Sequence, residues 1–213
     1  MDMKMIDEGL YRLYVPFEDI ATAVYFAVYD GGTVIIDTAT YPQDADNYII
    51  PALAELGIDR EAVKYIALTH KHGDHAGGAS RLSELLPWAC ILSPEPKKGV
   101  SSVQLNDGEV LLGGMRAICL AGHTDRSFGF YDIKTRTLFS GDCLQLGGIG
   151  RYTNGIKYPE LYLASVEKLR GMDIERIVAS HEYVPLGSTA EGKKAVKIYL
   201  DTCEDIARKT EWK

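Results

Sequence analysis

The residues of this sequence best suited to chemistry are its five histidines. Three of them fall in the segment 69–75, THKHGDH, directly after an apolar run. His70 and His72 are two residues apart, so in an extended segment their side chains point the same way. Asp74 and His75 follow where a helix is expected to begin, and they can face a second point nearby. Neutral imidazole and carboxylate oxygen suit zinc, iron or manganese, so the segment predicts a metal site.

Three further candidate ligands each follow an apolar run later in the chain. His123 stands in CLAGHTDRSF, Asp142 in LFSGDCL and His181 in IVASHEY. Binding residues gather in the loops where strands end, and no histidine of the sequence lies outside these motifs. A single histidine at a strand end is more often a structural residue. That alternative does not account for three histidines in one loop, so the pattern favours metal binding.

The hydrophobic pattern indicates the elements that must position these residues. Strands are predicted at about 10–16, 22–30, 33–37, 63–69, 88–93, 109–114, 115–121, 128–133, 135–141 and 174–180. Helices are predicted at about 42–56, from 74 or 76 to 86, at 158–170 and at 189–208. This order predicts two β-sheets between outer helices. No linker interrupts the chain, so we expect a single domain, 1–213.

The composition of the chain argues against nucleic-acid and membrane partners. The net charge of −7 argues against a nucleic-acid partner, which would favour a basic surface. The sequence contains no apolar run long enough for a membrane span and no signal pattern at its start, and its four cysteines form no CxxC pair. We therefore expect a cytoplasmic protein that acts on a small molecule, without nucleic acid or membrane partners.

The order of these motifs resembles the metallo-β-lactamase superfamily. HxHxDH follows a strand, and a GHT-type histidine, a GD aspartate and a late strand-end histidine come after it, with matching residues from Asp37 to His181. The resemblance implies an α/β (α+β) fold, a four-layer αββα sandwich with metals at the edge of the two sheets. It also implies an enzyme with two Zn²⁺ ions per chain, for which iron or manganese are alternatives.

The resemblance assigns the ligands as well. It implies one metal on His70, His72 and His123, and a second on Asp74, His75 and His181, with Asp142 bridging both. Asp74 would also be catalytic, as the group that takes a proton from the nucleophile. Asp37 matches an aspartate that supports the histidine loop from behind. A turn or helix cap is the alternative for Asp37.

Several branches of this superfamily differ in details that the sequence contains. FSGDCLQLGGIGR resembles the loop after the bridging aspartate of glyoxalase II, but only 32 residues follow His181, where those enzymes carry a helical extension that binds glutathione. Metallo-β-lactamases proper lack an aspartate matching Asp142. Acyl-homoserine lactonases have a catalytic tyrosine where Gln145 stands. We therefore expect a dinuclear hydrolase of a small-molecule ester, thioester or lactone.

Three alternatives remain open at this point. Persulfide dioxygenases of the same superfamily hold a single iron on residues matching His70, His123 and Asp142, and their GxGR segment resembles 148–151. A phosphodiesterase or nuclease of the same fold is the second alternative. An inactive metal-binding module is the third.

Substrate contacts are expected from the loop 143–158 after Asp142, because it is rich in glycine and close to a ligand. An arginine there could pair with a carboxylate or phosphate. The candidates in this loop are Arg151, Tyr152, Asn154 and Tyr158. Phe17, expected in a turn at 16–21, could form an apolar wall over the site. The last helix could support a homodimer.

Overall fold

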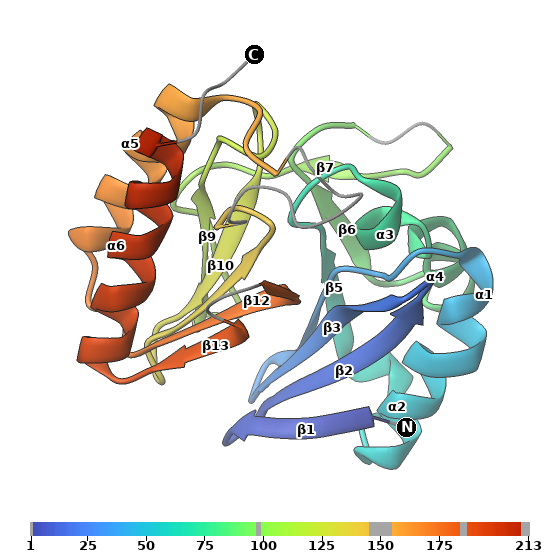
Figure 1. Ribbon diagram of the computed structural model, residues 1–213. Coiled ribbons are helices and arrows are strands. Elements are labelled where there is room, and N and C mark those ends of the chain that lie inside the picture. The colour runs from blue at the N-terminus through green and yellow to red at the C-terminus, as the bar shows by residue number, and fades with distance from the viewer. Residues whose placement is uncertain (1, 97–98, 145–154, 184–186, 210–213) are drawn as a thin grey trace. The chain divides into compact units, whose positions relative to one another are not determined.

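The computed structural model describes residues 2–96, 99–144, 155–183 and 187–209 (Figure 1). By its internal contacts the chain divides into two compact units. The N-terminal unit comprises 1–105 and 111–113, and the C-terminal unit comprises 106–110 and 114–213. The expectation of a single domain stays a prediction. Within the described ranges, no helix is long and apolar enough to cross a membrane.

The N-terminal unit is built on a seven-stranded sheet, counted over its described residues, whose strands follow chain order. The strands are β1 (Asp2–Asp7), β2 (Leu10–Phe17), β3 (Ile20–Tyr29), β4 (Gly32–Ile36), β5 (Val63–Ala67), β6 (Cys90–Ser93) and β7 (Val103–Gln104). β1 to β4 pair antiparallel through short turns, whereas β4 to β7 pair parallel. Parallel pairing requires crossover connections, and the helices of this unit lie in those connections.

Those helices cover one face of the sheet. They are α1 (Pro42–Asp44), the π-helical η1 (Ala45–Ile49), α2 (Ile50–Glu55), the short 3₁₀ helix η2 (Arg60–Ala62), α3 (Gly73–Ala76) and α4 (Ala79–Leu85). Across the sheet, Ile35 pairs with Phe26 on one side and with Ile66 on the other, and this row packs in one core with Leu53 of α2 and Leu82 of α4. Each such side chain contributes about 1.5–3 kcal/mol by leaving water.

Both helices predicted in this unit are interrupted. The predicted helix 42–56 passes through a π-helical segment before α2, where Pro51 has no N–H to continue the hydrogen-bond ladder. The predicted helix up to 86 divides into α3 and α4 at Gly77–Gly78. There Gly77 donates its backbone N–H to the carbonyl of Ala39 rather than to a helical carbonyl.

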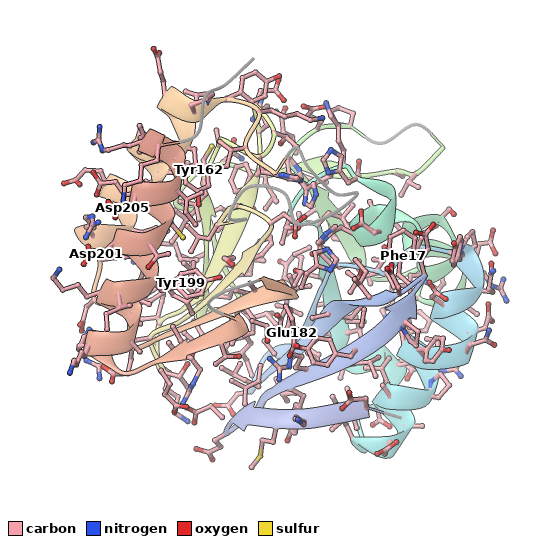
Figure 2. All side chains as sticks on the ribbon, in the orientation of Figure 1. Phe17, Tyr162, Glu182, Tyr199, Asp201 and Asp205 are labelled. Carbon is pink, nitrogen blue, oxygen red and sulfur yellow. The ribbon has the colours of Figure 1, made fainter. Side chains whose placement is uncertain are left out.

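The C-terminal unit contains a six-stranded sheet, again counted over described residues, in the order β13-β12-β11-β10-β9-β8. Its strands are β8 (Val110–Leu111), β9 (Met115–Cys119), β10 (Phe128–Asp132), β11 (Thr137–Gly141), β12 (Arg176–Tyr183) and β13 (Gly187–Glu191). Leu138 pairs with Tyr131 and Ile177 and shares a core with α5 (Pro159–Arg170) and α6 (Lys193–Lys209). Tyr162 of α5 and Tyr199 of α6 are among the largest side chains in that core (Figure 2).

The sequence missed or misplaced a few elements of the two sheets. β1 and β7 had no predicted counterpart, and the predicted strand 109–114 is reduced to the two residues of β8. The predicted helix 189–208 was wrong at its start, because 189–191 belong to β13. Gly192, with a φ of +83°, turns the chain from that strand into α6.

Candidate metal centre

Four of the predicted ligands lie together in the N-terminal unit, between β5 and the end of α3. We call them the N-terminal ligand set: His70, His72, Asp74 and His75. Nε2 of His70 lies 3.0 Å from Nδ1 of His72. Two nitrogens bound to one tetrahedral zinc at their usual bond length are about 3.3 Å apart. The distance between the two nitrogens is thus close to the distance expected of two nitrogens that bind the same ion.

The carboxylate of Asp37, fully buried just after β4, organises this loop from behind. Its Oδ2 lies 2.7 Å from Nδ1 of His75, and its Oδ1 accepts the backbone N–H of Thr69 at 2.8 Å. The carbonyl of His75 in turn accepts the backbone N–H of Thr38 at 2.7 Å and its hydroxyl at 2.9 Å. Asp37 has a φ of +62°, a left-handed conformation that costs energy outside glycine and is retained where the surroundings fix it.

Asp74 and His75 form the second pair of this set, in the first turn of α3. Oδ2 of Asp74 lies 3.6 Å from Nε2 of His75. Because Nδ1 of His75 is engaged by Asp37, Nε2 is the nitrogen left for a ligand, and it is the atom next to the Asp74 carboxylate. His75 is completely buried, whereas about a quarter of the Asp74 side chain is exposed, at 23%.

The C-terminal unit holds the other three predicted ligands, His123, Asp142 and His181, here called the C-terminal ligand set. Oδ2 of Asp142 lies 3.6 Å from Nε2 of His123, and its Oδ1 lies 3.6 Å from Nε2 of His181. All three side chains are buried. Each oxygen of one carboxylate therefore faces a different imidazole nitrogen, an arrangement compatible with a carboxylate that bridges two ions.

The loop around His123 is fixed by close packing and by hydrogen bonds. Nδ1 of His123 lies 2.6 Å from the carbonyl oxygen of Gly155, so this ring too leaves Nε2 for a ligand. Thr124 and Ser127 brace the loop through a 2.8 Å contact between their hydroxyls. Gly122 lies against α5, where an added Cβ would come within 2.6 Å of Cα of Tyr162. A glycine before His123 is thus required by packing.

Tyr199, which interacts electrostatically with Asp142, and its neighbour Cys203 are held in their neutral forms. Burial raises the pKa of Tyr199, and the nearby Cys203 and Asp142 raise it further. Burial likewise raises the pKa of the Cys203 thiol to about 12. At neutral pH neither group competes with the histidines as an anionic ligand, and Cys143 and Cys203 lie in the apolar core as packing residues.

The expected substrate-contact residues are only partly placed. Arg151, Tyr152 and Asn154 lie outside the described residues. Tyr158 precedes α5, with its side chain exposed and its backbone N–H bound to the carbonyl of Gly122 at 2.9 Å. Phe17 is the last residue of β2 rather than part of a turn, and it packs edge-on against Tyr41 at 6.4 Å between ring centroids (Figure 2). Whether either residue contacts a substrate stays a prediction.

This geometry singles out two groups that have no role predicted from the sequence. Thr69 directly precedes the histidine motif, and its hydroxyl lies 3.0 Å from Nδ1 of His70. A threonine at the end of a buried strand, directly before a candidate ligand, is the signal that could have identified it. The carbonyl of Gly155 has no such signal, because any residue offers one.

Comparison with protein families matches residues 18–98 to the model described as the metallo-beta-lactamase superfamily. A curated relative, a hydroxyacylglutathione hydrolase from Yersinia pestis (strain Pestoides F), is 33% identical over 163 residues, which are 74% of this chain and 61% of the relative. This chain therefore spans about three fifths of the length of such relatives.

Solved structures resemble the chain over nearly its whole length. A metallo-beta-lactamase from Cronobacter sakazakii gives a TM-score of 0.74 at 17% identity and covers 98% of this chain and 97% of its own. A variant of a flavo di-iron protein from Thermotoga maritima gives a TM-score of 0.78 at 17% identity over 99% of this chain and 62% of its own. At these identities the likeness shows the fold alone, and it confirms the predicted fold class.

Proposed function

We propose a hydrolytic function for this chain, which belongs to the metallo-beta-lactamase superfamily. The proposed reaction is the metal-dependent cleavage of an ester, thioester or lactone bond in a small molecule. The observation that carries it is the division of the Asp142 carboxylate between His123 and His181, at 3.6 Å each. A carboxylate placed in this way suits a pair of ions, and paired ions are a common device for hydrolysis.

The proposal combines the two ligand sets into one centre. The donor atoms fit zinc, because they are imidazole nitrogens and carboxylate oxygens, and the rings of His75 and His123 each have their other nitrogen engaged by a neighbouring oxygen. Iron or manganese would suit the same donors. The first ion would be held by His70, His72 and His123, the second by Asp74, His75 and His181, and both by Asp142. Two zinc ions per chain are therefore proposed.

Such ions, when bound, supply a hydroxide nucleophile at neutral pH and polarise the carbonyl of the substrate. The chain's own residues then account for the remaining steps. Asp37 and the carbonyl of Gly155 hold the rings of His75 and His123 in one orientation. Asp74 has a partly exposed carboxylate within 3.6 Å of Nε2 of His75, so it can take the proton of the nucleophile and pass it to the leaving group.

The substrate class is proposed from the relatives and from the ligand set. The name of the Yersinia pestis relative describes a hydrolase of hydroxyacylglutathione. That relative is longer than the aligned region, so we propose the bond type, an activated acyl bond, and leave the glutathione part aside. Arg151 and its neighbours remain the proposed contacts for an acidic group of the substrate.

A panel of substrates tests this function directly. Zinc-loaded protein is assayed with thioesters, lactones, simple esters, phosphodiesters and a persulfide, the last with an oxygen electrode. Hydrolysis of an acyl substrate without oxygen uptake is the expected result. Oxygen uptake with the persulfide by iron-loaded protein, with no acyl hydrolysis, would replace the proposal with the single-iron oxidoreductase. Hydrolysis of phosphodiesters alone would replace it with a phosphodiesterase.

A further inference from the structure

We propose that Thr69 is a positioning residue that links His70 to Asp37, so that one buried carboxylate sets the ligand nitrogen of two histidines. The inference rests on the proposed metal centre, in which His70 and His75 belong to different ions. All the contacts that carry it lie within the N-terminal unit, between β4, β5 and α3.

The donors and acceptors around Asp37 allow one consistent arrangement. As a carboxylate, Asp37 has only acceptor sites. It receives the backbone N–H of Thr69 at 2.8 Å, the hydroxyl of Thr69 at 2.8 Å to Oδ2, and Nδ1–H of His75 at 2.7 Å. Thr69 thus donates its single hydroxyl hydrogen to Asp37.

The hydroxyl oxygen of Thr69 can then only accept from its other neighbour. That neighbour is Nδ1 of His70, at 3.0 Å, so His70 must carry its hydrogen on Nδ1. Nε2 of His70 is left with its lone pair, 3.0 Å from Nδ1 of His72. Asp37 therefore fixes the tautomer of His75 directly and that of His70 through Thr69.

Because Thr69 links only His70 to Asp37, substitutions of Asp37 and of Thr69 are expected to have different effects on the histidines. Replacement of Asp37 releases both rings, whereas replacement of the Thr69 hydroxyl releases only His70. Loss of a hydrogen bond behind a ligand typically weakens metal binding by about 10- to 100-fold. Valine keeps the β-branched shape of threonine without the hydroxyl, and serine keeps the hydroxyl, so Thr69→Val and Thr69→Ser form a matched pair.

The test has a readout that does not depend on activity. In metal-free wild-type protein, nitrogen-15 NMR of the histidine rings near pH 8 is expected to show His70 and His75 protonated on Nδ1. In T69V, His70 is expected to lose that single tautomer while His75 keeps it, and T69S should match wild type. His70 found with its hydrogen on Nε2 in the wild type would overturn the proposal, even if T69V did not fold.

Zinc titration against a chromophoric chelator supplies the second readout. T69V should weaken one zinc equivalent about 10- to 100-fold, D37A should weaken both, and T69S should stay near wild type. Unchanged zinc affinity in folded T69V would refute the role of the hydroxyl. Protein that shows these tautomers but hydrolyses none of the acyl substrates would contradict the proposed function and leave the role of Thr69 intact.

Discussion

Oδ2 of Asp142 lies 3.6 Å from Nε2 of His123, and this leaves Oδ1 of the same carboxylate to His181, also at 3.6 Å. A side chain that only accepted hydrogen bonds from one histidine would not need this division. The carboxylate is buried, where an isolated charge is costly, so in the proposed centre the bound ions would compensate its charge.

Substitution of Asp142 by asparagine should show whether hydrolysis and zinc binding depend on the negative charge of this side chain. Asp142→Asn keeps the shape and loses the negative charge, so we expect hydrolysis to fall on the order of 100-fold or more and zinc binding to fall below two equivalents. Steady-state kinetics and elemental analysis of the same preparation check this. Wild-type kcat in folded D142N would show that Asp142 is not part of the centre.

Glycine at 77 should be required for stability. An added Cβ there would lie 1.6 Å from the carbonyl oxygen of Thr40 and 2.6 Å from that of Gly73, and backbone atoms cannot move aside as a side-chain end can. Gly77→Ala is expected to lower the free energy of unfolding by about 3 kcal/mol or more. Gly73→Ala is the matched control within the same loop, because a Cβ at Gly73 meets nothing within 4 Å. Equal denaturation midpoints for the two variants would contradict this account of α3.

The free energy of unfolding should decrease at alkaline pH. Burial raises the pKa of Cys203 to about 12 in the folded chain, above the value of the unfolded thiol, and the pKa of Tyr162 and of Tyr199 is raised for the same reason. A raised folded-state pKa contributes stability that is complete below the unfolded pKa and is lost as the pH rises through the folded one. Urea denaturation should thus show constant stability up to about pH 8 and a decline above it, because an unperturbed thiol titrates near 8.5.

Removal of one of these groups provides the control for the alkaline effect. The free energy of unfolding of Cys203→Ala should decline less steeply above pH 9, because the raised pKa of this thiol no longer contributes. Stability that increased between pH 9 and 11 would mean that the buried thiol and phenols do not behave as the structure indicates.

The sequence predicted most of the strands because their apolar and β-branched residues are local signals. Phe26, Ile35 and Ile66 each lie in a run of residues that predicts a strand from the local sequence alone, without information on the neighbouring strands. The interruptions in the helices were not predicted, since the break at Gly77 depends on its hydrogen bond to the carbonyl of Ala39, which is distant in the sequence. The residues of β13 were likewise not predicted as a strand, because the pairing of β13 with β12 does not follow from the local sequence.

The candidate ligand residues stand out in the sequence because their types are rare and their spacing is specific. The groups that orient them could be predicted only in part. Asp37 matched a known pattern, whereas the contact of Thr69 with His70 and that of Gly155 with His123 depend on how the chain folds back on itself. The role of each ligand in a common centre remains a prediction from the resemblance.

The number of metal ions bound per chain is the decisive measurement for the proposed centre. Protein purified without chelator, or reconstituted from the metal-free form with zinc, is analysed by inductively coupled plasma mass spectrometry against a protein concentration from amino-acid analysis. We expect two ions per chain in the wild type and fewer in D142N. Well under one ion per chain after reconstitution, in folded protein, would contradict the proposed centre.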